Sequence, residues 1–306
     1  MSLNARIANI QGQDRMAIVV ETARPKVNLT LAIRGRRADG YHELASLVAF
    51  ADGPVDRITL DTGAAPGITV TGPFANAIEG ENLLQRVLDR IAPHLRGGSP
   101  GQVTLSKHLP VAAGVGGGSA DAAALMRAIR RAHPDADPHV DWPALALSLG
   151  ADVPVCVAST ATWMTGIGET LSAVAALPPL PAVLVNPLCP VPADKTARVF
   201  RALAAPLLDD AKPPLPPPTI RETVPAQIAE LTRYRNDLTA AATTVVPAID
   251  NVLAALEASD GCRLARLSGA GPTAFGLFED RAAAEAAAAV LRSQHPGWWI
   301  AATVLG

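Results

Sequence analysis

Long apolar runs, closely spaced cysteines and an excess of charge of either sign are all missing from this chain. Its 306 residues include 26 basic and 28 acidic side chains, and the net charge of −2 gives no general attraction for nucleic acid or an anionic membrane. No uninterrupted apolar run approaches the ~20 residues that span a bilayer, and residues 1–16 contain no apolar signal core. We therefore expect a cytoplasmic protein that binds neither nucleic acid nor membrane, and we expect disorder at residues 1–16.

Cysteine and aromatic residues are also scarce. The three cysteines, Cys156, Cys189 and Cys262, lie far apart with no CxxC spacing, which argues against a disulfide framework and against a zinc site. We expect isolated, packed thiols. Aromatic residues make up 4% of the chain and apolar residues 49%, so the core must consist mainly of aliphatic side chains and alanine. No acidic cluster is typical of a dedicated metal site, and none is predicted.

Segments typical of strands and helices alternate along the chain, without a repeat of the ~20 to 50 residues seen in solenoids. This pattern predicts a mixed α/β (α+β) protein of two domains, which we place at residues 1–165 and 166–306, with the closing strand able to pack back on the first. The proline-rich stretch at 211–219 predicts a surface loop. Expected helices are 81–95, 120–133, 142–150, 191–203, 280–293 and most of 235–259, with a break before Pro247. Expected strands include 18–20, 27–33, 102–110, 151–157, 181–185 and 298–306.

A glycine-rich stretch, PVAAGVGGGSADAAAL at residues 110–125, is the main candidate for a binding loop. Glycines allow positive φ angles and close approach to a ligand, and Ser119 can cap a helix that begins near Ala120, whose free N–H groups attract an anion. The spacing fits neither a P-loop, which needs a following Lys, nor a dinucleotide fingerprint. A flexible turn before an alanine-rich core helix remains the alternative, because the glycines alone do not decide between them.

Polar residues in two other segments are candidates for catalysis. Lys26 and Asn28 are two residues apart in an expected strand, so they share one face. Asp152 stands between an expected helix and an expected apolar strand, where an unpaired charge is costly, so it should have a partner. Pairing with Lys26 across a cleft is the functional interpretation. The alternative is that Lys26 is an exposed strand residue and that Asp152 belongs to a turn.

Tyr41 and His42 follow the turn residues Asp39 and Gly40, in a chain with only two tyrosines. A ring beside an imidazole suits stacking on a planar base and hydrogen bonding to its edge. A hairpin turn with a half-buried tyrosine is the alternative. Phe200, on the helix expected at 191–203, is a core residue unless other evidence places it in a site.

Three motifs resemble, in order, those of the GHMP small-molecule kinases: PKVNLTL, PVAAGVGGGSADAA and SGAGPTAF. Within that superfamily, GRRADGYHELASL, GADVPV and RNDL resemble the branch that serves the non-mevalonate route to isoprenoids. The similarity extends over almost the whole chain from about Ala17. The resemblance implies an N-terminal lobe like ribosomal protein S5 and a ferredoxin-like C-terminal lobe, with the site between them.

The resemblance also implies a reaction and its residues. ATP, with Mg²⁺, would phosphorylate the 2-hydroxyl of 4-(cytidine 5'-diphospho)-2-C-methyl-D-erythritol, with Asp152 as general base and Lys26 as its catalytic partner. Asn28 would bind substrate beside this pair, and Tyr41, His42 and Phe200 would hold the cytosine. Ser119 is a candidate Mg²⁺ ligand, and a monomer or weak homodimer is expected. The residues implied to bind ATP are Pro110, Ala113, Gly114, Gly116, Gly117, Gly118 and Ser119.

The chain departs from the family pattern at a few positions. Leu188 follows Pro187 where the family usually has Gly, and Thr239 follows Asn236-Asp237-Leu238 where an acidic residue is common. Two rival functions remain: another kinase of the superfamily, such as a homoserine or mevalonate kinase, and a nucleotide-binding protein without catalysis. The segment GRRADGYHEL disfavours the first because those enzymes have no cytosine to hold. The presence of both Lys26 and Asp152 disfavours the second.

Overall fold

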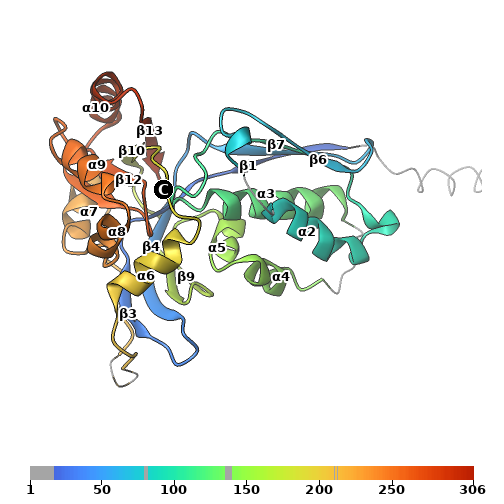
Figure 1. The fold of residues 1–306 in the computed structure, drawn as a ribbon, viewed down its shortest axis with the longest axis horizontal. Helices are drawn as coiled ribbons and strands as arrows, with labels where there is room; N and C mark the ends of the chain where they lie inside the picture. The colour runs from blue at the N-terminus through green and yellow to red at the C-terminus, as the bar shows by residue number, and fades with distance from the viewer. Residues whose placement is uncertain (1–16, 79–81, 135–139, 210, 212) are drawn as a thin grey trace, which may run out of the picture.

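The computed structural model describes residues 17–78, 82–134, 140–209, 211 and 213–306, and these residues form three sheets with helices packed around them (Figure 1). The disorder that we expected at residues 1–16 falls outside the residues that the structure describes. The first sheet has the order β1-β5-β7-β6, and only its β6–β7 pair is parallel. Its strands are β1 (Ile18–Ala23), β5 (Asp56–Asp61), β7 (Gln102–Ser106) and β6 (Gly67–Thr71).

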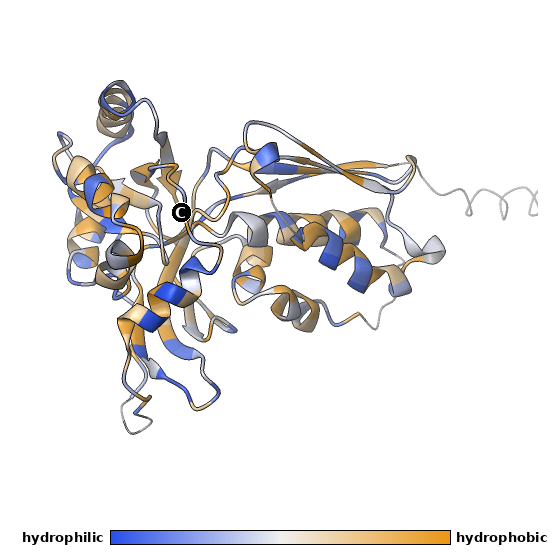
Figure 2. Ribbon diagram, in the orientation of Figure 1, coloured by the Kyte–Doolittle hydropathy of each residue, from blue (hydrophilic) through white to orange (hydrophobic). Residues whose placement is uncertain are grey.

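Helices α2 (Leu83–Ile91) and α3 (Gly117–Ala132) cover one face of the first sheet (Figure 1). Leucine, valine and isoleucine recur in α2 at helical spacing, so that Leu84, Val87 and Ile91 are buried while the charged residues form hydrophilic bands along the helix (Figure 2). Alanines line the buried side of α3 and let it approach the sheet closely. Two further helices, α4 (Trp142–Leu149) and α5 (Val153–Ala158), complete this layer.

The second sheet has five strands. Its order is β2-β4-β8-β9, and β3 also pairs with β4. Strand β4 has antiparallel partners β2, β3 and β8, and six consecutive residues at its C-terminal end, 45–50, are buried. The strands are β2 (Lys26–Asn28), β3 (Ala32–Arg36), β4 (His42–Phe50), β8 (Thr162–Gly166) and β9 (Thr170–Ala173).

The third sheet is antiparallel and has the order β11-β12-β10-β13. Every residue of its central strand β10 is buried, in agreement with the apolar segment expected at 181–185. Its strands are β10 (Leu180–Asn186), β11 (Leu264–Leu267), β12 (Ala274–Leu277) and β13 (Trp299–Leu305). The helices of this half are α6 (Lys195–Leu203), α7 (Val224–Leu231), α8 (Thr239–Val245), α9 (Ala248–Glu257) and α10 (Arg281–Gln294), and single 3₁₀ turns in the first half are η1 (Ala75–Ala77), η2 (Ala92–His94) and η3 (Arg96–Gly98).

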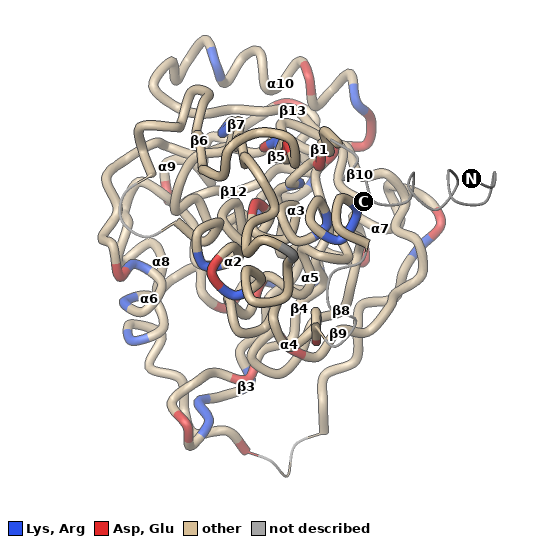
Figure 3. Tube along the Cα trace, turned by 90° about the vertical axis from the view of Figure 1, so that its right-hand side faces the viewer, with Lys and Arg blue, Asp and Glu red and all other residues tan. Residues whose placement is uncertain are grey.

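The expected mixed α+β class is confirmed, and the break before Pro247 separates α8 from α9. The closing strand β13 pairs along its length with β10. Only its end reaches the first expected domain, residues 1–165, where Phe50 and Gly306 exchange two backbone hydrogen bonds of 3.0 Å. No helix in the described segments has the length and apolar character needed to cross a membrane. Acidic and basic positions are interspersed along the chain (Figure 3), as the small net charge suggests.

Two expectations about local structure are wrong. Residues 153–158 form helix α5 instead of a strand, because Pro154 fits the first turn of a helix and the segment packs against α3 and α4. Helix α3 begins at Gly117 and its N-cap is Gly116, with φ of 64°, so Ser119 lies inside the first turn and caps nothing. Gly116 takes the cap because only glycine adopts that left-handed conformation without strain.

Candidate active site

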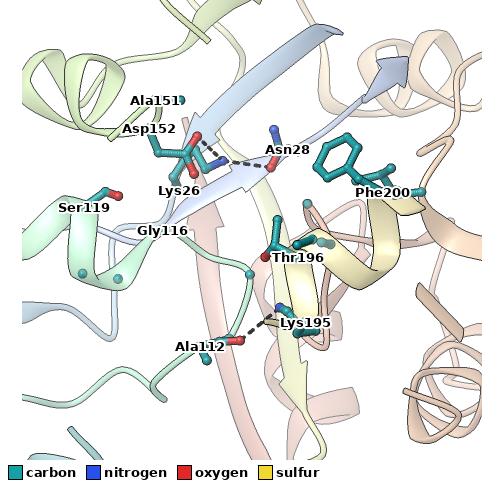
Figure 4. A pocket seen from close by; sticks show the side chains of 18 of the residues that line it. Lys26, Asn28, Ala112, Gly116, Ser119, Ala151, Asp152, Lys195, Thr196 and Phe200 are labelled. Carbon is teal, nitrogen blue, oxygen red and sulfur yellow. Dashed lines mark hydrogen bonds and ion pairs between the residues drawn. The ribbon is translucent and has the colours of Figure 1, made fainter. Parts of the chain in front are cut away.

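One cavity of about 1630 Å³ brings together all the residues that the sequence singled out. It opens where the second sheet, the glycine-rich loop and helix α6 meet, and Figure 4 shows side chains from all three around it. The sequence-predicted residues that line it are Lys26, Asn28, Tyr41, His42, Pro110, Ala113, Gly114, Gly116, Gly117, Gly118, Ser119, Asp152 and Phe200.

Lys26 and Asp152 form an ion pair at one wall of the cavity. The Lys26 Nζ atom lies 3.0 Å from Asp152 Oδ1 and 3.1 Å from Asn28 Oδ1 (Figure 4). Lys26 is buried, whereas the side chain of Asp152 is 37% exposed, so its second oxygen is accessible to a ligand. Asn28 also donates to Ser46 Oγ over 2.8 Å, which fixes its amide. The pairing expected across a cleft is therefore present, between strand β2 and the N-terminus of α5.

The glycine-rich loop crosses the cavity next to this pair. Its end is the N-terminus of α3, where free backbone N–H groups and the helix dipole favour an anion. Gly114 has φ of 81°, and a Cβ atom there would lie 2.5 Å from the carbonyl oxygen of Gly271, so a side chain is excluded. The Lys26 backbone N–H donates to the Val115 carbonyl over 2.8 Å, which ties strand β2 to the loop.

The second glycine turn, between β11 and β12, supports the first. Ser268 Oγ donates to the Gly114 carbonyl over 3.1 Å, and the Thr273 N–H donates to the Ala113 carbonyl over 3.0 Å. Ser268 Oγ also accepts from the Asn28 N–H over 3.3 Å. A glycine turn between two apolar strands is typical of a plain hairpin, and β11 and β12 do form one. Its contacts nevertheless hold the loop and strand β2 in register.

Two rings meet at the opposite wall of the cavity. The ring centroids of His42 and Phe200 are 4.7 Å apart with 32° between their planes, although the residues come from β4 and α6. Burial, followed by the charge of Arg36, lowers the pKa of His42, so its imidazole is neutral at pH 7. Tyr41 is 61% exposed beside them and is free to cover a planar group. These residues could hold a flat heterocycle by stacking and by hydrogen bonds to its edge.

A buried ion cluster under the glycine-rich loop was not foreseen. Lys107 Nζ lies 2.5 Å from Asp56 Oδ2 and 2.6 Å from Asp121 Oδ2, and Asp56 also accepts backbone N–H groups from His108 and Leu109. Burial raises the pKa of Asp121 to about 7, against the opposing effect of Lys107. Although burial alone lowers the pKa of Lys107, the two carboxylates raise it above its ordinary value. No sequence pattern links three residues so far apart.

Within the described residues, no group of three or more His, Cys, Asp and Glu side chains is placed to hold a metal ion. The three cysteines have no disulfide partner, and Cys156 is buried beside the ion pair. Burial raises the pKa of its thiol to about 12, which makes it inert at neutral pH.

Two family models match the chain. The model of the GHMP kinases N terminal domain covers residues 82–160, and the model GHMP kinases C terminal covers residues 220–297. Among curated proteins, 4-diphosphocytidyl-2-C-methyl-D-erythritol kinase of Methylobacterium radiotolerans is 49% identical over 95% of this chain and 100% of its own length. The protein of the same name from Dinoroseobacter shibae is 48% identical over 92% of both chains.

A comparison with solved structures finds the same kind of kinase. A crystal structure of 4-(cytidine 5'-diphospho)-2C-methyl-D-erythritol kinase is similar with a TM-score of 0.72 and 35% identity, over 94% of this chain and 99% of that one. Homoserine kinase from Cytophaga hutchinsonii has a TM-score of 0.66 with 16% identity over 95% and 96% of the two chains, which shows a shared fold alone.

Proposed function

Because this chain belongs to the GHMP kinases, and among them to the 4-diphosphocytidyl-2-C-methyl-D-erythritol kinases, we propose that it phosphorylates 4-(cytidine 5'-diphospho)-2-C-methyl-D-erythritol with ATP. The acceptor is its 2-hydroxyl, and the product serves the non-mevalonate route to isoprenoids. The observation that carries the proposal is a single cavity with the Lys26–Asp152 pair at one wall, a glycine-rich helix N-terminus beside it and an aromatic pair opposite.

The ion pair is suited to activate the acceptor. Asp152 takes the proton of the 2-hydroxyl, the freed oxygen forms a bond to the γ-phosphorus, and the bond from that phosphorus to the β–γ bridging oxygen breaks as ADP leaves. Lys26 orients Asp152 and offsets the negative charge that develops on the transferred group. Asn28 keeps the Lys26 ammonium directed into the cavity.

The two ends of the cavity suit the two nucleotides. The glycine-rich loop with Ser119 offers backbone N–H groups and a hydroxyl to the ATP phosphates. His42 and Phe200 suit the cytosine, Tyr41 is free to cover it, and the neutral imidazole can hydrogen bond to its edge. Mg²⁺ bound to ATP would neutralise phosphate charge, and the Ser119 hydroxyl would be its protein ligand beside the phosphates and water.

We further propose that the protein works in the cytoplasm as a monomer or weak homodimer. The comparisons do not support the rival function expected from sequence, a homoserine or mevalonate kinase. Those acceptors have no ring, and the pairing of His42 with Phe200 would then have no ligand to hold.

An acceptor panel tests the proposal. ADP release is measured with the cytidylylated methylerythritol, homoserine, mevalonate and no acceptor, and the position of the new phosphate is read by ³¹P NMR. We expect turnover with the first compound alone and phosphate on its 2-oxygen. Turnover with homoserine or mevalonate, or none with any acceptor, would contradict the proposal.

A further inference from the structure

Three buried lysines line the cavity, and one of them has no counter-ion among the residues that the structure describes. Lys26 pairs with Asp152, and Lys107 lies between Asp56 and Asp121. Lys195 is only 5% exposed, and no described carboxylate lies within ion-pair distance of its ammonium. The carboxylate next to it in sequence, Asp194, pairs instead with arginines farther along α6.

Backbone carbonyls fix the position of the Lys195 ammonium. Its Nζ atom donates to the carbonyl of Ala112 over 3.1 Å (Figure 4). It also donates to the carbonyl of Gly271. Ala112 belongs to the glycine-rich loop and Gly271 to the second glycine turn, and both have positive φ angles, of 55° and 68°. Lys195 thus connects α6 to both turns, and an ammonium with three N–H groups keeps one for a further partner.

Two carbonyls supply dipoles but no compensating charge. A buried ammonium without an anion is costly, and burial accordingly lowers the pKa of Lys195 to about 8. An anion that enters the cavity would provide the missing charge. The neighbouring Thr196 and Phe200, also on α6, line the same cavity, so such an anion would lie between the loop and the wall that carries the aromatic pair.

We propose that Lys195 binds a phosphate oxygen of a substrate diphosphate with its third N–H, from a position that the Ala112 and Gly271 carbonyls hold ready. This inference rests on the proposed function, which brings two diphosphate-containing substrates to the cavity: the nucleotide donor and the cytidylylated acceptor. Either diphosphate satisfies the chemistry of the site. Lys195 is a substrate-binding residue in addition to those that the motifs indicate.

A purely structural lysine would make the same two carbonyl contacts, and substitutions separate the two roles. Lys195→Gln keeps N–H donors for the carbonyls and removes the charge, whereas Lys195→Met removes both. Arg198→Met is the matched control, because Arg198 is an exposed cation of the same helix that does not line the cavity. The melting temperature of each variant reports whether the fold is kept.

Binding of ADP, CDP and inorganic pyrophosphate is measured separately by calorimetry on the full chain. For Lys195→Gln we expect a melting temperature close to that of the unsubstituted chain. Its affinity for pyrophosphate, and its affinity for either ADP or CDP, should fall by about tenfold or more. Arg198→Met should change the affinity for each ligand by less than about twofold. The nucleotide that loses affinity identifies which diphosphate Lys195 holds.

Unchanged affinity of Lys195→Gln for all three ligands would overturn the proposal and leave Lys195 a structural tie. If Lys195→Met alone is destabilised, the result for Lys195→Gln still decides. A failure of the proposed function is distinguishable, because it appears as absent turnover in the unsubstituted chain, whereas a failure of this inference leaves turnover intact.

Discussion

At the scale of single residues, Asp152 is the group on which the proposed chemistry depends most. Its carboxylate is half open to the cavity and is held by Lys26 at 3.0 Å. We predict that Asp152→Asn lowers kcat by about 10² to 10⁴-fold, since an amide cannot accept the hydroxyl proton, while calorimetry finds both substrates still bound. Asp89→Asn, an exposed carboxylate of α2, is the control. A variant within tenfold of normal turnover would remove Asp152 from this role.

Leu188 is a residue whose backbone conformation suits another amino acid. It has φ of 48° and is exposed, and it stands at a position where the family resemblance of the sequence implies glycine. A left-handed residue with a Cβ costs roughly 1 to 2 kcal/mol, of which the greater flexibility of glycine in the unfolded chain returns a part. We predict that Leu188→Gly raises the free energy of unfolding by about 0.5 to 1 kcal/mol in urea titrations. A decrease would show that Leu188 contributes through contacts instead.

At the scale of elements, the buried cluster that joins β5, β7 and α3 makes a prediction about pH. Burial raises the pKa of Asp121 to about 7 in the folded chain, whereas an unfolded aspartate loses its proton near the ordinary pKa of 3.8. The folded state therefore binds more protons in between, and the stability from this group falls as the pH rises toward about 7 and then levels off. Asp121→Asn removes that dependence.

Urea unfolding from about pH 5 to about pH 8 checks this expectation. The free energy of unfolding of the unsubstituted chain should decline relative to Asp121→Asn as the pH rises, and a constant difference would contradict the assignment. At about pH 8, where Asp121 is ionised in the unsubstituted chain, Lys107→Met should be worse than Asp121→Asn by about 3 to 5 kcal/mol, because it removes the cation that both buried carboxylates share.

Elements also mark the limit of what could be predicted from sequence. Periodic segments such as α2 and β10 were predictable because their apolar spacing matches one regular structure. The α5 segment was not, since its valines favour a strand, whereas Pro154 in the first turn and packing against α3 and α4 favour the helix. The motif residues could be found because they are contiguous. Lys107 and Lys195 could not, because a lone lysine looks exposed until distant segments enclose it.

At the scale of the whole molecule, the two expected domains share a hydrophobic core. Val27, Leu47 and Ala49 of the second sheet pack in one cluster with Leu184 and Phe275 of the third. Arg266 adds polar ties: its guanidinium donates to the carbonyl of Leu29 as well as to two carbonyls of its own half. Burial lowers the pKa of this arginine to about 10. The boundary placed at 165/166 therefore separates halves that complete each other's core.

We therefore predict one cooperative unfolding transition for the whole chain, and two native cysteines can report it. Cys156 is buried in the first half and Cys262 packs in the second, so maleimide labelling of each in increasing urea follows the two halves separately. The two midpoints should coincide. Phe275→Ala, which opens the shared core, should lower the free energy of unfolding by about 3 to 5 kcal/mol and shift both midpoints together to lower urea. The exposed Val290→Ala should shift neither midpoint. If Cys262 became reactive at lower urea than Cys156, the halves would be independent domains, and the cavity between them would depend on substrate to hold its shape.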